Sequence, residues 1–202
     1  KFVSEKEPTT LPWGELGVDV VVESTGLFTD FEKAAVHIQA GAKKVVISAP
    51  AKGGEGKGET ILMGVNEEKF GTCDVTSNAS CTTNAASPLI AILDENFGIE
   101  KAILNTVHGY TASQALVDGP SKKDLREGRA AAQNIVPTST GAAIAVTKAF
   151  TKLEGLFDGI SIRVPVPAGS IVDVTFISKK ETTAEEVNNV LREAAKTDRW
   201  KD

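Results

Sequence analysis

The chain has 202 residues, of which 41% are hydrophobic and 24% charged, a composition typical of globular proteins with one large or two modest domains. A net charge of −5 excludes a general electrostatic attraction to nucleic acids or anionic membranes. No apolar run approaches the roughly 20 residues needed to span a bilayer, so we expect a cytoplasmic protein with neither membrane nor nucleic acid as a partner. Two cysteines without CxxC spacing and two histidines argue against a disulfide framework and against a metal site.

Strands and helices alternate at the start of the chain, which is the pattern of an α/β protein. Residues 18–24 are a short β-branched run of the kind that is buried in parallel sheets. A helix is predicted over residues 30–42, and we interpret His37 within it as a surface or boundary residue. Residues 43–50 form the next predicted strand. Such βαβ units usually bind ligands at the carboxyl ends of their strands.

Glycines punctuate residues 52–60, but this segment lacks the Gly-Lys-Ser/Thr ending of a P-loop and is better interpreted as a solvated turn. Residues 61–65 and 73–78 predict further strands, and Cys73 is expected in the core. The second half of the chain has longer predicted strands, at residues 100–108, 159–166 and 170–178. A helix follows, and it opens with a capping box from Thr183 to Glu186. We expect two domains, residues 1–80 and residues 81–202.

Cys81 is the residue whose surroundings most strongly suggest chemistry. Ser80, Thr82 and Thr83 are helix N-cap types, and an apolar helical pattern follows with a predicted kink at Pro88. A cysteine in the first turn of a helix faces unpaired amides and the positive end of the helix dipole, which stabilise a thiolate. The residues alone leave two alternatives open, a nucleophile and a small buried core residue.

A thiolate nucleophile needs a base or a cation beside it. His108 ends a predicted strand and precedes Gly109, an arrangement that presents a side chain at the carboxyl end of a strand. On its own this pattern fits a catalytic base and a hydrogen-bonded structural histidine equally well.

Several motifs together resemble one enzyme family. They are SNASCTTN around Cys81, TVHGYT around His108, DGPSKKDLREGRAAAQNIVPTSTGAA, RVPV, and the upstream VVESTGLFT and GAKKVVISAPAK. Their order and spacing are similar to those of glyceraldehyde-3-phosphate dehydrogenases over essentially all 202 residues. The family's N-terminal GxGxxGR turn and its C-terminal part have no counterpart here, so the sequence resembles an internal fragment. The resemblance implies part of a Rossmann-type parallel-sheet NAD domain followed by an α+β catalytic domain.

The resemblance also implies a mechanism and its residues. Cys81 would attack the aldehyde of glyceraldehyde 3-phosphate, His108 would act as the base, and inorganic phosphate would release 1,3-bisphosphoglycerate from a thioester. The attacking phosphate would bind at Ser80, Thr82, Thr140 and Gly141, and the substrate phosphate at Thr111 and Arg163. The residue types fit these two phosphate sites. Thr140 and Gly141 precede a predicted helix N-terminus, which attracts anions, and the guanidinium of Arg163 can donate two parallel hydrogen bonds to phosphate oxygens.

On the cofactor side, the resemblance points to a set of strand-end and loop residues: Ser24, Thr25, Gly26, Phe28, Ser48, Asn78 and Pro120. Pro120 is the residue usual in NAD-preferring members, so NAD is favoured over NADP. A homotetramer is implied as well. Two alternatives stay open: erythrose-4-phosphate dehydrogenase, which shares the nucleophile and the histidine, and a non-enzymatic assembly or binding protein or inactive fragment.

Overall fold

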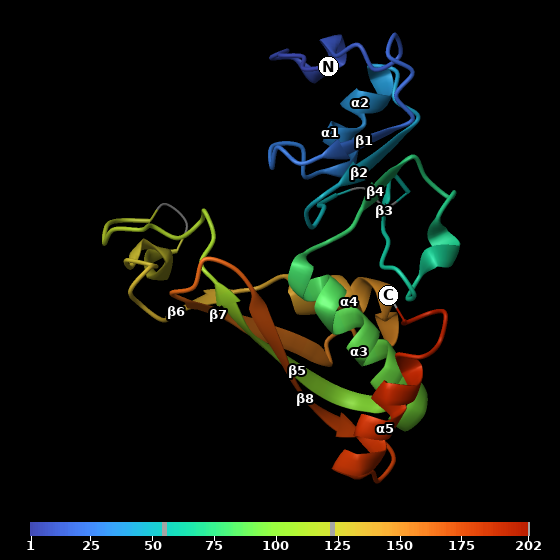
Figure 1. Ribbon diagram of the computed structural model, residues 1–202, viewed down its shortest axis with the longest axis vertical. Helices are drawn as coiled ribbons and strands as arrows, with labels where there is room; N and C mark the ends of the chain where they lie inside the picture. Colours follow the sequence, from blue (N-terminus) through green and yellow to red (C-terminus); the bar gives the residue numbers. More distant parts are fainter. Residues whose placement is uncertain (54–55, 122–123, 202) are drawn as a thin grey trace. The chain divides into compact units, whose positions relative to one another are not determined.

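The computed structural model describes residues 1–53, 56–121 and 124–201 (Figure 1). Two residues of the Gly-rich segment interpreted as a turn, Gly54 and Glu55, lie outside this range. The chain divides into two compact units, Lys1–Asn84 and Ala85–Asp202. Across the residues that are described, no helix has both the length and the apolar character needed to cross a lipid bilayer. The fold is mixed α/β, as expected from the sequence.

The first unit is built on a small parallel sheet. Its strands are β1 (Val20–Glu23), β2 (Lys44–Ile47), β3 (Glu59–Thr60) and β4 (Val75–Ser77), in the order β1-β2-β4-β3. All three pairings are parallel, so the carboxyl ends of the strands share one edge. The unit also contains two short 3₁₀ helices, η1 (Pro8–Thr10) and η2 (Glu67–Lys69). The β-branched run at residues 18–24 forms β1 as predicted, but only one face of the strand is buried: Val21 and Glu23 are buried, while Val20 and Val22 are exposed.

Two short helices, α1 (Phe31–Ala34) and α2 (Val36–Gln39), replace the single helix expected between β1 and β2. Asp30 caps α1 by accepting the amides of Glu32 and Lys33. The break falls at Ala35, whose ψ of −10° departs from the α-helical value of about −42°. The apolar residues of both helices pack on the sheet in one core: Phe31, Ala34, Val45, Ile47, Ala51 and Val75, with Ala35 and Ile38 at its edge.

The second unit is a four-stranded mixed sheet with helices on one face. Its elements in chain order are α3 (Cys81–Phe97), which begins in the last residues of the first unit, β5 (Ile99–Gly109), η3 (Leu125–Gly128), β6 (Val136–Ser139), α4 (Ala142–Ala149), η4 (Thr151–Leu153), β7 (Phe157–Val164), β8 (Ser170–Ser178) and α5 (Ala184–Ala194). The strand order is β6-β7-β5-β8. Strand β5 pairs parallel to β7 and antiparallel to β8, so the long strands at 157–164 and 170–178 flank β5 and do not pair with each other.

The core of the second unit lies between this sheet and the helices. It joins Ala86, Ile90, Leu93 and Phe97 of α3 to Ala102 and Leu104 of β5, Ala142, Ala143 and Val146 of α4, and Phe157 of β7. Pro88 sits inside α3, which continues on both sides of it. The predicted capping box of α5 is confirmed: Thr183 accepts the amide of Glu186, and the Glu186 carboxylate accepts the amide of Thr183.

Two predictions for residues 61–78 were wrong in detail. Residues 61–65 do not form a strand: Ile61 and Leu62 are buried, but the chain turns at 63–65, and Asn66 holds that turn by accepting the amide of Leu62 and donating to the carbonyl of Thr60. Cys73 is half-buried rather than part of the core, and its thiol donates to the carbonyl of Val75. The strand at residues 61–65 was predicted from a short apolar run, and such a run does not show that an asparagine will stabilise a turn there.

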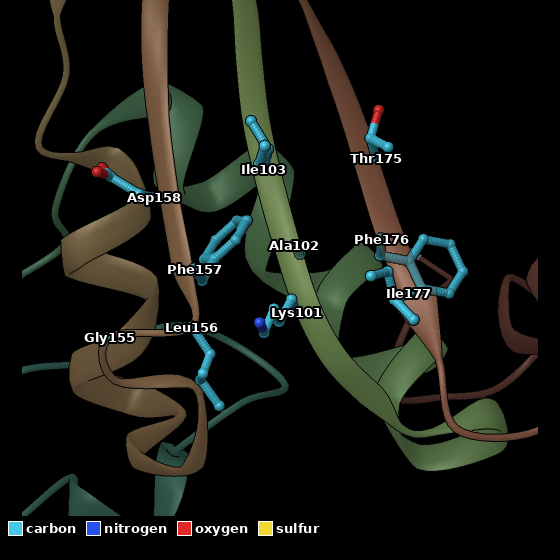
Figure 2. A pocket seen from close by; sticks show the side chains of 10 residues that line it. All are labelled: Lys101, Ala102, Ile103, Gly155, Leu156, Phe157, Asp158, Thr175, Phe176 and Ile177. Carbon is cyan, nitrogen blue, oxygen red and sulfur yellow. The ribbon is translucent and has the colours of Figure 1, made fainter.

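The sheet face away from the core of the second unit is hollowed and carries both apolar and charged side chains. Side chains alternate along each strand, so Ala102 and Leu104 enter the core while Lys101 and Ile103 lie on the opposite face. A hollow of about 450 Å³ lies along β5, β7 and β8, lined by Ile103, Leu156 and Ile177 among others (Figure 2). None of the residues predicted to bind substrate or cofactor lines it.

Candidate functional site

The nucleophile candidate stands at the first position of α3, as the sequence predicts. The Ser80 hydroxyl accepts the Thr83 amide at 3.0 Å and shares a hydrogen bond with the Thr83 hydroxyl at 2.8 Å. These are the bonds of a helix N-cap. Cys81 is exposed and in no disulfide, whereas Thr82 is buried. An accessible thiol therefore stands at the amide end of a 17-residue helix.

The approach to α3 is fixed by a side chain that sequence reasoning missed. Asn84 donates through Nδ2 to the carbonyl of Asn78 at 2.7 Å and to that of Ser80 at 2.9 Å. Between them Ala79 has a φ of +60°, in the left-handed region that L-residues rarely occupy, and its side chain is buried. The segment before Cys81 is therefore held in one strained shape.

The predicted cofactor residues of the first unit gather at the carboxyl ends of β1, β2 and β4. The hydroxyl of Ser48 donates to Ser24 Oγ at 2.9 Å, and the amide of Ser48 donates to the carbonyl of Glu23. The amide of Asn78 donates to the carbonyl of Ile47. The parallel sheet thus places Ser24, Ser48 and Asn78 along one edge. This edge is where parallel α/β sheets bind ligands.

A tight turn follows β1 at this edge. Gly26 has a φ of +76°, and nothing lies within 4 Å of the position a Cβ would take. Thr25 donates its amide to Glu23 Oε1 at 2.7 Å, its hydroxyl donates to the same oxygen, and the Leu27 amide donates to Thr25 Oγ1. Phe28 packs at the border of the core and against the ring of His37, edge to face at 6.1 Å between centroids. Hydrogen bonds from Glu23 therefore hold one side of the turn, and the space next to Gly26 is open.

Glu23 and His37 form a buried pair that sequence reasoning did not find. His37 is 5% exposed and Glu23 4% exposed, and His37 Nε2 lies 2.8 Å from Glu23 Oε2. The interpretation of His37 as a surface residue was wrong, because Trp13 and Phe28 cover it. Burial of Glu23 by itself would raise its pKa, but the hydrogen bonds from Thr25 and His37 outweigh burial and lower the pKa.

In the second unit His108 occupies the end of β5 opposite Arg163 of the parallel strand β7. His108 Nδ1 lies 2.6 Å from the carbonyl oxygen of Gly109, and Arg163 donates to that same oxygen at 3.5 Å. A carbonyl only accepts, so Nδ1 carries the proton, and in the neutral ring Nε2 holds the basic lone pair. A side chain on Gly109 would collide with the carbonyl of Val166, at 2.7 Å. The close approach of the 166–169 loop therefore requires glycine here.

Thr111 begins a turn just after β5. Its amide donates to Gln114 Oε1 at 2.8 Å, and its hydroxyl bonds with Ser113 Oγ and with Gln114 Oε1, each at 3.2 Å. Gln114 is buried and also donates to Ser113 Oγ. The exposed Thr111 is thus oriented by Gln114, a residue that the sequence did not single out.

Thr140 and Gly141 open α4 as predicted. The Thr140 hydroxyl accepts the amide of Ala142 at 3.1 Å, and Gly141 is the N-cap residue. Gly141 is exposed, with open space around the position of a Cβ. A helix N-terminus with an exposed glycine lets an anion approach the backbone amides closely.

Pro120 is exposed in the loop that leads to η3. Asp118 anchors this loop by accepting Nε of Arg129 at 3.1 Å and the amide of Ala130 at 2.8 Å. The bond from the Arg129 side chain, followed by the backbone bond, lowers the pKa of Asp118. The amide of Gly119 donates to the carbonyl of Gly128, which closes the loop.

The structure brings the predicted residues into separate groups within the two units. Ser24, Thr25, Gly26, Phe28, Ser48 and Asn78 share one sheet edge of the first unit, and Ser80, Cys81 and Thr82 open α3. In the second unit His108 and Arg163 share the carbonyl of Gly109. Among residues 1–53, 56–121 and 124–201, no group of three His, Cys, Asp or Glu side chains is arranged to hold a metal ion.

Comparison with known proteins identifies the family. The sequence model described as "Glyceraldehyde 3-phosphate dehydrogenase, C-terminal domain" matches residues 80–201. A glyceraldehyde-3-phosphate dehydrogenase of Streptomyces coelicolor is 52% identical over 197 residues, and one of Mycobacterium avium is 53% identical over 189 residues. Glyceraldehyde-3-phosphate dehydrogenase B of Aspergillus oryzae is 50% identical over 195 residues.

These matches cover 93–96% of this chain and 55–57% of the relatives. The chain therefore spans little more than half the length of the curated relatives it matches. The similarity extends through both units and includes the segment around Cys81. The chain belongs to the glyceraldehyde-3-phosphate dehydrogenase family.

Proposed function

We propose that the full-length protein containing this chain oxidises glyceraldehyde 3-phosphate with NAD and inorganic phosphate to 1,3-bisphosphoglycerate. The observation that carries the proposal is the exposed Cys81 at the capped first position of α3. Membership of the family and the names of the relatives support the same reaction. Residues 1–80 would contribute to the cofactor domain and residues 81–202 to the catalytic domain.

Cys81 and His108 carry the first half of the proposed reaction. His108 Nε2 takes the thiol proton of Cys81, the thiolate attacks the aldehyde carbon, and this proton passes to the carbonyl oxygen, which becomes the hydroxyl of a hemithioacetal. His108 then takes the hydroxyl proton at Nε2, which is the basic nitrogen because Nδ1 donates to Gly109. A bound nicotinamide cofactor would supply the acceptor for the hydride that leaves the same carbon. Loss of the proton and the hydride leaves a thioester on Cys81.

Inorganic phosphate completes the turnover. One of its oxygens attacks the thioester carbon, and the bond to Cys81 breaks to return the thiolate. The helix ends at Ser80, Thr82, Thr140 and Gly141 would hold this phosphate through hydroxyls and backbone amides. Thr111 and Arg163 would hold the phosphate of the substrate, because a guanidinium matches two phosphate oxygens at once.

The first unit has features that fit a dinucleotide. Ser24, Ser48 and Asn78 lie at the carboxyl edge of a parallel sheet, and the open space at Gly26 lets a ligand approach the backbone closely. We assign Ser24, Thr25, Gly26, Phe28, Ser48 and Asn78 to the cofactor, with Pro120 reaching the cofactor of a neighbouring subunit. NAD is proposed rather than NADP, and a cytoplasmic location accords with this reaction.

A homotetramer belongs to the proposal as well. Exposed isoleucines cluster on the outer face of the sheet in the second unit: Ile103, Ile160, Ile171 and Ile177. Exposed apolar patches of this kind mark contact surfaces in proteins that associate. The names of the relatives do not support the erythrose-4-phosphate alternative.

The test is the phosphate dependence of NAD reduction by the full-length protein with glyceraldehyde 3-phosphate. The proposal expects turnover that requires phosphate and is abolished by Cys81→Ser, while Cys73→Ser, the matched change at the other cysteine, keeps it. Turnover that persists in Cys81→Ser would overturn the nucleophile assignment. Wild-type turnover that is indifferent to phosphate would indicate hydrolysis instead.

A further inference from the structure

A series of hydrogen bonds, buried at Glu23 and His37, runs beneath the turn that follows β1. It begins at the indole of Trp13, passes through His37 and Glu23, and ends on Thr25. Trp13 Nε1 lies 3.2 Å from His37 Nδ1, and His37 Nε2 lies 2.8 Å from Glu23 Oε2. All four residues belong to the first unit.

The direction of every hydrogen bond in this series is fixed by chemistry. An indole N–H can only donate, so Nδ1 of His37 must accept. The single proton of the neutral ring is therefore on Nε2, which donates to Glu23 Oε2. Glu23 Oε1 accepts the amide and the hydroxyl of Thr25. The N–H of His37 and both donors of Thr25 point toward the carboxylate, so only an ionised Glu23 satisfies both neighbours.

The packing around this series leaves little freedom for rearrangement. The rings of Trp13 and Phe28 lie against His37, with centroids 6.3 and 6.1 Å away. Trp13 is itself held at the end of α2: the Gly14 amide donates to the carbonyl of Ala40, and a Cβ on Gly41 would lie only 2.5 Å from Gly14. The imidazole cannot rotate to a new partner without displacing these groups.

We propose that Trp13, His37 and Glu23 are positioning residues that set the shape of the Thr25–Gly26 turn for dinucleotide binding. Glu23 fixes the amide and hydroxyl of Thr25, and Thr25 in turn accepts the amide of Leu27 across Gly26. The inference rests on the proposed function, which assigns this turn to the cofactor. None of the three residues needs to touch the ligand.

The variant Glu23→Gln in the full-length protein tests the donor and acceptor directions of these hydrogen bonds. A glutamine has one accepting oxygen and one donating nitrogen, so if the oxygen serves Thr25, the nitrogen faces the N–H of His37. His37 cannot relieve this by moving its proton to Nδ1, because the N–H of Trp13 already points there. We expect the Kd for NAD to rise about tenfold, while KM for glyceraldehyde 3-phosphate changes less than about twofold. Amide hydrogen exchange at residues 24–28 of the cofactor-free protein should accelerate.

Adding Trp13→Phe supplies the decisive comparison. Without the indole N–H, His37 can carry its proton on Nδ1 and accept, at Nε2, the side-chain N–H of the glutamine introduced by Glu23→Gln. The double variant should therefore recover both tight NAD binding and slow exchange at residues 24–28, relative to Glu23→Gln alone. If the two substitutions simply add their losses, the proposal is overturned. Glu59→Gln is the control. It makes the same change in a β3 residue that pairs with Lys69, and it should leave both readouts unchanged.

A second pair of variants decides the case in which Glu23→Gln does not fold. His37→Gln can accept from Trp13 through its oxygen and donate to Glu23 through its nitrogen, so it should retain NAD binding, whereas His37→Leu should weaken it. Equal binding by these two variants would overturn the inference. Failure of the proposed function is separate: a wild-type protein that binds NAD but shows no phosphate-dependent turnover would leave these binding and exchange results standing.

Discussion

His108 and Arg163 stand opposite each other on the parallel strands β5 and β7, and both donate to the carbonyl oxygen of Gly109. This shared acceptor fixes the tautomer of the histidine and brings a permanent positive charge to the end of the strand from which the imidazole projects. One backbone oxygen therefore orients both the proposed base and the arginine proposed to bind phosphate.

Replacing His108 removes the proposed base. His108→Asn can keep a hydrogen bond to Gly109 but has no nitrogen that accepts a proton, so kcat should fall by about 10²- to 10⁴-fold. Steady-state NAD reduction by the full-length protein measures the loss, and Glu154→Gln, a change at an exposed loop residue, is the control. A His108→Asn protein with wild-type kcat would contradict the role of the imidazole.

Arg163→Lys keeps the charge and loses the planar fork. A lysine cannot give two parallel hydrogen bonds to phosphate oxygens, so KM for glyceraldehyde 3-phosphate should rise by about 10- to 100-fold. KM for NAD should stay within about twofold of the wild-type value. Equal effects on both constants would indicate a general structural defect instead of a lost phosphate contact.

The left-handed backbone at Ala79 makes a prediction about stability. Ala79→Gly relieves the strain of a positive φ and should unfold at a urea concentration equal to or above that of the wild type. Ala79→Val places a β-branched side chain in a buried left-handed position and should destabilise the protein by about 1–3 kcal/mol. The reverse order of the two variants in urea unfolding would show that the backbone at this position does not constrain the sequence.

The lowered pKa of Glu23 links stability to pH. A carboxyl group whose pKa is lower in the folded state stabilises the fold at pH above its unfolded pKa, about 4.3, and this contribution is lost as the pH falls through the folded pKa. The difference in unfolding free energy between wild type and Glu23→Gln should therefore be largest near pH 7 and shrink below about pH 4. Urea unfolding at a series of pH values checks this, and a difference that grows on acidification would refute it.

The exposed isoleucines on the outer face of the sheet in the second unit predict how subunits associate. Ile103→Glu places a charge at the hollow of Figure 2 and should shift a tetramer toward smaller species in sedimentation velocity. Asn188→Glu, which adds the same charge to the exposed surface of α5, should leave the assembly unchanged. An unaltered tetramer in Ile103→Glu would place the subunit contact elsewhere.

Local signals in the sequence predicted much of the fold. The start of α3 at Cys81 and the capping box at Thr183 follow from residues within one turn of helix, and both are found in the structure. The break at Ala35 and the turn at residues 63–65 were missed, because the apolar periodicity continues through the first and an apolar run enters the second.

The supporting residues of the candidate site were harder to predict than the site residues themselves. His37 is covered by Trp13, 24 positions earlier, so its burial depends on tertiary packing that helical periodicity does not encode. Asn84 and Gln114 act through side-chain bonds to nearby backbone, and these residue types are equally common in plain turns. The contacts between Trp13, His37 and Glu23 could have been predicted only by considering which side chains meet when β1 and α2 pack together.

The most direct test of the central claim is to trap the acyl group on Cys81. The full-length protein is mixed with NAD and glyceraldehyde 3-phosphate in the absence of inorganic phosphate, quenched in acid, and analysed by peptide mass spectrometry. The account predicts one 3-phosphoglyceroyl group on the peptide containing Cys81, which disappears when phosphate is added before the quench. A modified peptide that lacks Cys81, or NAD reduction in stoichiometric amount with no acyl group on the protein, would contradict the thioester mechanism.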